Sequence, residues 1–255
     1  MINILSIAGS DPSGGAGIQV DLKTFQALGV HGMAVPAALT AQNSRGVTAS
    51  TQVTPRDLSR QLEILLADIE PDAVKTGMLL TTGSVTAVAK AVRKHHIRNL
   101  VVDPVIRSSS GKMLLKPDAV ASIRKELFPL ALVITPNIPE AEALTGMRIV
   151  TDEEMDFAAG MLMDMGPRYV LIKGGHRKGP ATDTLYGGKT VLSFSTERQK
   201  GEFHGTGCVL SSAIAVFIGK GLPVEKAVEK AKLFVEKMLK KAKRVGKGKA
   251  RYFQF

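Results

Sequence analysis

Short apolar runs alternate with helical patterns along most of this chain, and that alternation limits the possible folds more than any other feature. The runs expected to form strands cover residues 2–8, 33–39, 72–75, 100–104, 132–136 and 169–173. The helical patterns cover residues 16–28, 55–69, 81–95, 118–127, 152–165, 209–219 and the stretch from 223 onward. Apolar strands that short loops join to helices are typical of a parallel sheet covered on both faces. The sequence therefore predicts an α/β fold with a mostly parallel central sheet.

The pattern changes after residue 175, where two strand-like segments follow each other without a helix between them. Residues 182–187 and 190–195 are joined by Gly187, Gly188 and Lys189, which predicts a β-hairpin at an antiparallel edge of the sheet. Pro36 argues against the strand at 33–39, because proline cannot donate to a ladder. With no long linker or repeat, the 255 residues are expected to form one domain over 1–244 and a basic C-terminal tail over 245–255.

The net charge of +11 is concentrated near the C-terminus. Residues 237–251 hold eight Lys and Arg residues and no acidic residue. This segment is expected to be the solvated end of a helix and a tail rather than a nucleic-acid surface. With no Trp and only three Tyr, the chain has little surface on which single-stranded bases could stack. We therefore expect no nucleic-acid partner.

The composition points to a protein of a reducing compartment. No uninterrupted apolar run approaches the roughly 18 residues of a membrane span, so none is expected. The N-terminus lacks a basic region and begins directly with a strand pattern, so we expect no signal peptide. A single cysteine leaves no internal disulfide. The expected location is the cytoplasm.

Polar loops follow the carboxyl ends of several predicted strands, where parallel sheets bind their ligands. These loops are 9–11 (GSD), 103–104 (DP), 135–137 (TPN) and 173–176 (KGGH). Two familiar phosphate motifs are incomplete: 111–113 (GKM) lacks the rest of a P-loop, and 15–17 (GAG) and 205–207 (GTG) lack the third glycine of a dinucleotide fingerprint. A nucleotide would therefore bind in another architecture.

Residues 203–209 (FHGTGCV) combine two glycines, the only cysteine and the start of an apolar helix. Glycine permits close backbone approach, and the first amides of a helix favour negative charge. Gly205, Thr206 and Gly207 are therefore predicted to form an anion cradle. Cys208 is expected to have a lowered thiol pKa there and to lie beside a transferring phosphoryl group. The alternative is that Cys208 is simply a small buried apolar side chain.

Two other loops are candidate walls of a small-molecule pocket. The loop that starts at Gly9 is either a backbone-lined wall, with Asp21 facing it from the next helix, or a turn with Ser and Asp caps. The segment 40–44 contains Gln42, whose amide can both donate and accept at the edge of a heteroaromatic ring. The alternative for Gln42 is an ordinary polar loop.

A third group of residues suits phosphate and a divalent cation. Asp103 and Glu140 follow two strand ends, and Mg²⁺ is usually held through one or two carboxylates, waters and phosphates. Glu140 is otherwise an acidic residue in the first turn of a helix, which is common. Lys173 ends another strand and could meet phosphate as a point charge. No cluster has zinc spacing, and His176 and His204 are expected to be surface or hydrogen-bonded loop residues.

Taken together and in order, these segments resemble one family. They are 9–17 (GSDPSGGAG), 40–43 (TAQN), 75–78 (KTGM), 102–105 (VDPV), 135–142 (TPNIPEAE), 173–176 (KGGH) and 204–208 (HGTGC). From residue 2 to about 240 the chain resembles the bacterial hydroxymethylpyrimidine/phosphomethylpyrimidine kinases of thiamin biosynthesis, which belong to the ribokinase-like superfamily. The resemblance implies a three-layer sandwich and two ATP-dependent phosphorylations that convert 4-amino-5-hydroxymethyl-2-methylpyrimidine to its monophosphate and then its diphosphate. It also implies Mg²⁺, and we expect a homodimer.

The same resemblance implies roles for individual residues. Gln42 would bind the ring edge of the pyrimidine, in a pocket lined by Gly9, Asp21, Met78 and Val105. The phosphate side would be formed by Asp103 and Glu140 around Mg²⁺, Asn137 as their support, Lys173 and Thr206 near the nucleotide, and the Gly205–Thr206–Gly207 anion hole. Cys208 occupies the place where sugar-kinase relatives carry an aspartate base.

The Cys208 position suggests how one site could serve two acceptors. A neutral thiol would orient a hydroxyl in the first step and would not repel an anionic phosphate in the second. The chain departs from the family pattern at 106–111 (IRSSSG), where Arg107 could help bind the second phosphate, and at Val209. Two alternatives stay open: a pyridoxine/pyridoxal kinase of the same superfamily, against which Gln42 and Met78 argue, and a non-catalytic pyrimidine-binding regulatory protein.

Overall fold

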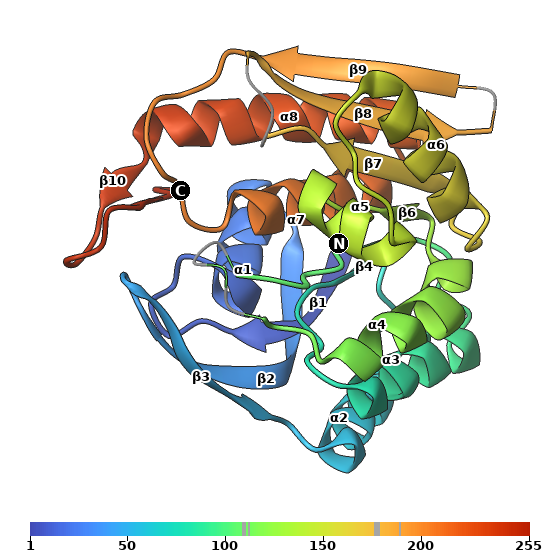
Figure 1. Cartoon of the computed structure of the whole chain (residues 1–255). Helices are drawn as coiled ribbons and strands as arrows, with labels where there is room; N and C mark the ends of the chain where they lie inside the picture. Colours follow the sequence, from blue (N-terminus) through green and yellow to red (C-terminus); the bar gives the residue numbers. More distant parts are fainter. Residues whose placement is uncertain (109–110, 112, 176–178, 189) are drawn as a thin grey trace.

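The computed structural model describes residues 1–108, 111, 113–175, 179–188 and 190–255. Among these residues nine strands form one sheet in the order β3-β2-β1-β4-β5-β6-β7-β8-β9 (Figure 1). The strands are β1 (Asn3–Ser10), β2 (His31–Asn43), β3 (Gly46–Gln52), β4 (Ala73–Thr76), β5 (Leu100–Val102), β6 (Val133–Ile134), β7 (Tyr169–Lys173), β8 (Ala181–Gly187) and β9 (Thr190–Thr196). Strands β2, β1, β4, β5, β6 and β7 pair in parallel, whereas β3, β8 and β9 pair antiparallel at the two edges. The predicted mostly parallel sheet and late hairpin are confirmed.

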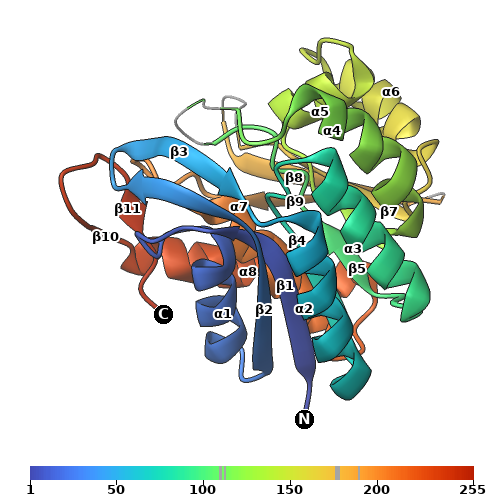
Figure 2. The ribbon, with the colours of Figure 1, turned by 90° about the horizontal axis from the view of Figure 1, so that it is seen from below.

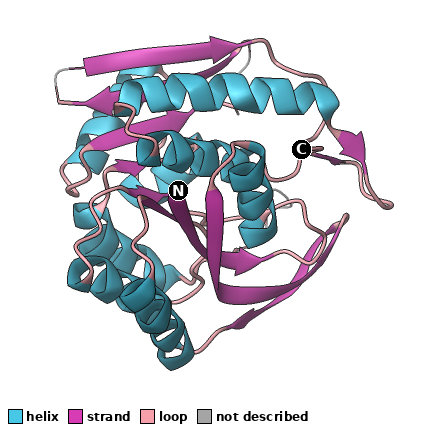
Figure 3. Cartoon of the chain, turned by 180° about the vertical axis from the view of Figure 1, so that it is seen from behind, coloured by secondary structure: helices cyan, strands magenta, loops and turns pink. Residues whose placement is uncertain are grey.

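Helices cover both faces of the sheet, which confirms the three-layer sandwich (Figures 2 and 3). They are α1 (Gly17–Ala27), α2 (Pro55–Asp68), α3 (Thr82–Lys94), α4 (Pro117–Ser122), α5 (Ile138–Thr145), α6 (Asp152–Met163), α7 (Thr206–Gly219) and α8 (Val224–Lys241). The apolar side chains of α2 to α6 form one core with the sheet, and those of α1, α7 and α8 form the other. None of the helices in the described part of the chain is long and apolar enough to cross a bilayer.

Strand β3 was not expected from the sequence. Apart from Val47, its residues 46–52 are small or polar, and all are exposed or only partly buried, as expected for an edge strand that pairs with β2 alone. Strand β2 runs on to Asn43 to meet it, so Gln42 lies in a β-hairpin and not in the loop that we considered. Pro36 is tolerated in β2 because β3 begins to pair with β2 only at Ala38, which leaves an open edge beside the proline.

The helical segments also depart from the predictions in places. The expected helix at 118–127 is α4 followed by a π-helical turn over Ile123–Leu127 and a short 3-10 turn over Phe128–Leu130. Helix α5 was expected only as a first turn after the strand end at 135–136. It forms because Asn137 and Glu140 make a capping box, in which each side chain accepts a hydrogen bond from the other residue's backbone amide.

The C-terminal segment is not the solvated tail that its charge suggests. Strands β10 (Lys243–Arg244) and β11 (Arg251–Tyr252) pair with each other, and Phe203 forms a parallel bridge with Arg251. Tyr252 and Phe253 are 4% and 5% exposed. The basic side chains of the segment face solvent while Tyr252 and Phe253 turn inward and Phe255 stays exposed, so composition alone concealed the packing.

Candidate active site

Residues that end or follow β1, β5 and β7 meet the first turn of α7, because Gly205 lies against the loop after β1 and Gly207 lies beside Lys173 and Asp103. Gly205 precedes this helix with φ of 82°, a conformation that favours glycine. A side chain at Gly205 would meet the carbonyl oxygen of Gly15 at 1.9 Å. The two glycine-rich loops therefore touch at the start of α7, where the first amides of a helix lack intrahelical partners.

Lys173 is the cation at the centre of the phosphate side. Its Nζ donates to Asp103 Oδ1 at 2.9 Å and lies 3.9 Å from Glu140 Oε2. A Cβ atom added at Gly207 would lie 3.1 Å from the same Nζ. Burial alone would lower the pKa of Lys173, but the two carboxylates outweigh it and raise the pKa above its usual value. The ammonium therefore stays charged beside the first turn of α7.

Glu140 caps the start of α5 and also faces Lys173. Its Oε2 accepts the backbone N–H of Asn137 at 2.9 Å, and Asn137 Oδ1 accepts the N–H of Glu140 at the same distance. Burial and the nearby Asp103 carboxylate raise the pKa of Glu140 to about 7, against the opposing effect of Lys173. The acidic first turn that we weighed as the ordinary alternative is present, and the same carboxylate also faces Lys173 and Asp103.

The donor set suits a cation that brings most of its own ligands. Within the described residues no group of three or more His, Cys, Asp or Glu side chains could enclose a metal. Asp103 and Glu140 instead offer two hard carboxylates beside one lysine, which is the arrangement expected for Mg²⁺ held partly by phosphate oxygens.

Cys208 differs from the sequence prediction of an activated thiol. Burial raises the pKa of this thiol to about 11, although Lys75 and the backbone N–H of Gly17 act in the opposite direction. The position at the start of α7 therefore does not lower the pKa as we expected. At neutral pH the group is a thiol, not a thiolate.

Asp21 does not line a pocket. It is 0% exposed, and its Oδ2 accepts from Lys75 Nζ at 2.8 Å and from the Ser6 hydroxyl. Its Oδ1 accepts from Ser212 of α7 at 2.7 Å. All of these partners are themselves fully buried. The carboxylate thus lies beneath the site, where it ties β1, β4 and α7 together.

A small apolar cluster contains two of the residues predicted to line the substrate pocket. It brings together Met78 and Val105 from two strand ends, with Ala38, Leu80 and Leu114. Gly9 adjoins it, since a Cβ atom there would lie 3.0 Å from Met78 Sδ. The structure therefore places Gly9, Met78 and Val105 side by side, as one wall. Arg107 beyond this wall is exposed, and its loop lies partly outside the described residues.

We assigned no functional role to Asp11 or His204 from the sequence: the loop after Gly9 was weighed as a turn with an Asp cap and His204 was expected to be a surface or hydrogen-bonded loop residue, and the structure confirms the cap and the hydrogen-bonded histidine. Asp11 is 2% exposed and accepts hydrogen bonds from the backbone of Ser13, Gly15 and Ala16. His204 Nε2 lies 3.0 Å from Asp11 Oδ2 and 2.9 Å from the Gln42 amide nitrogen. Burial opposes ionisation of Asp11, but the hydrogen bonds from His204 and Ser13 prevail and lower its pKa. The available signal was the Asp-Pro-Ser-Gly turn, in which an aspartate commonly binds its own backbone.

Two further polar groups were also missed. Ser211 in the otherwise apolar α7 lies 3.3 Å from Asp103 Oδ2. Asp183 on β8 accepts the N–H of Gly174 at 3.0 Å and forms a buried pair with Lys232 of α8. Ser211 thus contacts Asp103 directly, and Asp183 fixes the backbone next to Lys173. Two adjacent serines inside an apolar helix were the usable signal for Ser211. His176, at the end of the 173–176 motif, lies outside the described residues.

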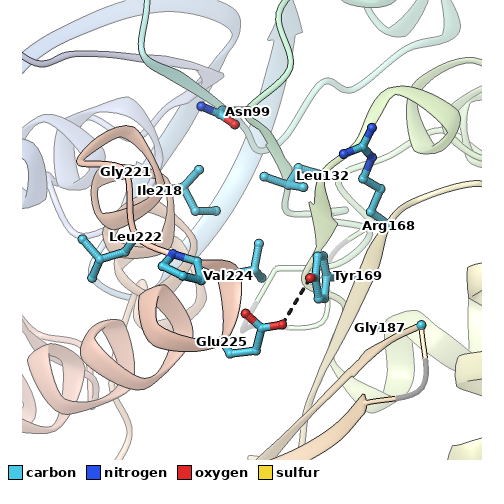
Figure 4. Close-up of a pocket in the computed structure, with 12 residues that line it drawn as sticks. Asn99, Leu132, Arg168, Tyr169, Gly187, Ile218, Gly221, Leu222, Val224 and Glu225 are labelled. Carbon is cyan, nitrogen blue, oxygen red and sulfur yellow. Dashed lines mark hydrogen bonds between the residues drawn. The ribbon is translucent and has the colours of Figure 1, made fainter.

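A separate groove of about 540 Å³ lies at the opposite end of the sheet, near the start of β7 and the turn between α7 and α8 (Figure 4). Tyr169 donates a hydrogen bond to Glu225 across it at 3.1 Å. It contains none of the predicted site residues. The groove is therefore separate from the predicted site at the carboxyl end of the sheet.

Comparisons with known proteins agree on the family and the fold. The family described as Phosphomethylpyrimidine kinase matches residues 11–252, a range that reaches past residue 240 and includes the C-terminal strands. A hydroxymethylpyrimidine/phosphomethylpyrimidine kinase of Rhizobium meliloti is 47% identical over 250 residues, which is 97% of this chain and 94% of the relative.

Solved structures give the same result. The crystal structure of phosphomethylpyrimidine kinase from Clostridium difficile has a TM-score of 0.84 and 42% identity, and the match covers 93% of this chain and 99% of that one. A pyridoxal kinase from Staphylococcus aureus in complex with AMP-PCP and pyridoxal has a TM-score of 0.90 at 32% identity, over 99% of this chain and 93% of that one.

Proposed function

Since the chain belongs to the phosphomethylpyrimidine kinase family, we propose that it transfers the γ-phosphoryl group of ATP to 4-amino-5-hydroxymethyl-2-methylpyrimidine and then to the resulting monophosphate. The observation that carries this proposal is the meeting of Lys173, Asp103 and the first turn of α7 beside the apolar wall of Met78 and Val105. A phosphate-binding half and a ring-binding half thus share one border, where the transfer takes place.

The phosphate half acts through position and charge. Phosphoryl transfer has a loose transition state, so charge stabilisation and alignment supply most of the rate. The Gly205–Thr206–Gly207 turn donates to the transferring group, and Lys173 neutralises the nucleotide phosphates. Asp103 and Glu140 would hold Mg²⁺, with Asn137 as support, and the ion when bound neutralises phosphate charge. Both carboxylates are already oriented by Lys173, which fits that role.

The acceptor half orients the pyrimidine. The side chains of Met78 and Val105 and the backbone at Gly9 form its apolar wall, and the Gln42 amide meets the ring edge. Cys208 stays neutral because burial raises its pKa to about 11, so it takes no proton before transfer. A loose transition state needs little early deprotonation of the hydroxyl. In the second step the acceptor is already an anion, and a neutral thiol does not repel it.

One assay tests the function. ADP release is followed with the hydroxymethylpyrimidine, with its monophosphate and with pyridoxal as acceptors. We expect turnover of the first two with a kcat/KM well above that for pyridoxal. Preferred turnover of pyridoxal would establish the pyridoxal kinase alternative, which the structural likeness to pyridoxal kinases favours. If none of the three acceptors supports ATP turnover, the non-catalytic regulatory protein is the remaining alternative. The homodimer and the cytoplasmic location stay predictions.

A further inference from the structure

The C-terminal segment 243–253 reaches the acceptor half of the site at three separate points. Beside the β2–β3 hairpin, Ser44 Oγ accepts the backbone N–H groups of Lys247 and Gly248 at 3.1 Å and 3.0 Å. Next to the loop that leads into α7, Arg251 accepts from the His204 amide at 3.0 Å and donates to the Glu202 carbonyl at 2.8 Å. Figures 1 and 2 both show β10 and β11 beside the hairpin.

Tyr252 makes the third contact. Its hydroxyl lies 3.0 Å from Ser13 Oγ in the loop after β1, and its ring lies 5.2 Å from that of His204 at an interplanar angle of 54°. The space between these loops is full, because a Cβ atom at Gly15 would lie 2.4 Å from both rings. Tyr252 therefore fills the position behind His204 and leaves the imidazole little room to turn.

Because His204 contacts Gln42, a restricted imidazole also restricts the side chain that would bind the pyrimidine. The Nε2 of His204 is the atom that lies near both Asp11 and Gln42. The lowered pKa of Asp11 keeps that group an acceptor, so Nε2 donates its proton to the Asp11 carboxylate. The Gln42 amide nitrogen lies 2.9 Å from the same ring nitrogen, so the position of the His204 proton decides which group of the Gln42 amide can face the ring and which is left for a ligand. A fixed imidazole therefore fixes which edge Gln42 presents.

We propose that residues 243–253 form a strap that positions His204 and Gln42 for the pyrimidine, with Tyr252 as its key positioning residue. The strap joins the hairpin that carries Gln42 to the loop that ends in the anion cradle, two segments that are far apart in sequence. Its effect is on acceptor binding, since none of its described contacts involves Lys173, Asp103 or Glu140. The substrate named here rests on the function proposed above.

The test compares Tyr252→Leu with Phe253→Leu, a matched loss of a buried ring on the same strap. Phe253 is 5% exposed but packs in the core with α7 and α8, away from His204. We expect Tyr252→Leu to raise KM for the hydroxymethylpyrimidine about tenfold, with KM for ATP changed less than about twofold. Tyr252→Phe, which loses only the hydroxyl contact to Ser13, should raise it about threefold. Phe253→Leu should lower the melting temperature and leave both KM values near wild type.

A cycle with His204→Ala separates positioning from general destabilisation. If Tyr252 acts through His204, the double variant His204→Ala/Tyr252→Leu has the pyrimidine KM of His204→Ala alone. If the fold-changes of the two single variants in pyrimidine KM multiply in the double variant, the strap proposal is wrong. It is also wrong if Tyr252→Leu and Phe253→Leu change that KM equally.

Hydrogen exchange of the ligand-free enzyme supplies a readout that does not depend on the substrate. Tyr252→Leu should speed exchange in 40–46 and 202–206, and Phe253→Leu should not. If the wild type phosphorylates another acceptor, the proposed function fails while this exchange result still decides the strap.

Discussion

Two lysine–aspartate pairs of nearly equal length lie below and beside Cys208, and they have different surroundings. Lys75 Nζ is 2.8 Å from Asp21, and both side chains are 0% exposed. Lys173 Nζ is 2.9 Å from Asp103, with the lysine 13% and the aspartate 2% exposed. The first pair is closed in by Ser6 and Ser212, whereas the second also faces Glu140 and Gly207.

The difference shows that pair chemistry alone does not assign function. The oxygens of both aspartates are bound by protein groups, but the Lys75–Asp21 pair is sealed, with no exposed side chain, and so cannot exchange a partner for a phosphate. The Lys173–Asp103 pair is open, since it keeps a partly exposed lysine beside a second carboxylate and the first turn of α7, and can rearrange around a phosphate. We therefore assign Lys75–Asp21 to the framework under Cys208 and Lys173–Asp103 to the chemistry, and four variants test this division.

The largest expected effect is on stability, from Lys75→Met. Removing one member of a buried pair leaves an uncompensated charge and costs about 3–5 kcal/mol. For a chain of this size that lowers the melting temperature by about 6–20 °C. Differential scanning calorimetry measures it. The matched variant Lys75→Met/Asp21→Leu removes both charges and should recover most of the loss. A small loss in the single variant would show that the pair is not sealed.

Asp103→Asn should instead have a large effect on activity and a small effect on stability. It removes the charge that orients Lys173 and would hold Mg²⁺, so kcat should fall about 100- to 1000-fold. Lys173 is partly exposed and keeps Glu140, so the loss of stability should be less than half of that in Lys75→Met. Steady-state kinetics and calorimetry on the same preparation provide both numbers. A stability loss equal to that of Lys75→Met would erase the distinction between the pairs.

The residues changed in these two variants also show which parts of the structure could be predicted from the sequence. Helical and strand periodicity predicted the parallel sheet, and strand-end position identified Asp103 and Lys173, because both depend on local pattern and a general rule of sheet topology. Asp21 was placed in a pocket wall because nothing local shows that Lys75, Ser6 and Ser212 converge on it. Strand β3 and the strap lack apolar periodicity, so only tertiary packing reveals them.

Glu140→Gln tests the electrostatic surroundings of the Lys173–Asp103 pair through the pH dependence of folding stability. The folded pKa of Glu140 is about 7 against a usual 4.5, so between these values the unfolded chain is ionised there and the folded chain is not. Folding stability therefore falls as pH rises from 4.5 to 7 and is level above that range. Glutamine keeps the capping box and has no charge to bury. In EDTA the variant should be more stable than wild type by about 1–3 kcal/mol at pH 8 and equal to it near pH 4.5.

Urea unfolding of both proteins across this range measures the difference. A wild type that gains stability between pH 4.5 and 7 relative to Glu140→Gln would show that Lys173, and not burial, dominates the environment of Glu140. The open pair would then resemble the sealed one in electrostatics as well as in distance.

The smallest effect is expected from Cys208, which is influenced by both pairs. Burial raises its pKa to about 11, with Lys75 lowering it and Asp21 and Asp103 raising it. A neutral thiol can orient the hydroxyl of the first acceptor, whereas the second acceptor is a phosphate anion that needs no such orientation. Cys208→Ala should therefore lower kcat of the first step about tenfold and that of the second step less than about threefold. Separate assays with the two acceptors give the ratio. Large and equal losses in both steps would contradict the neutral role and would place Cys208 with Lys173 and Asp103 in the chemistry of transfer.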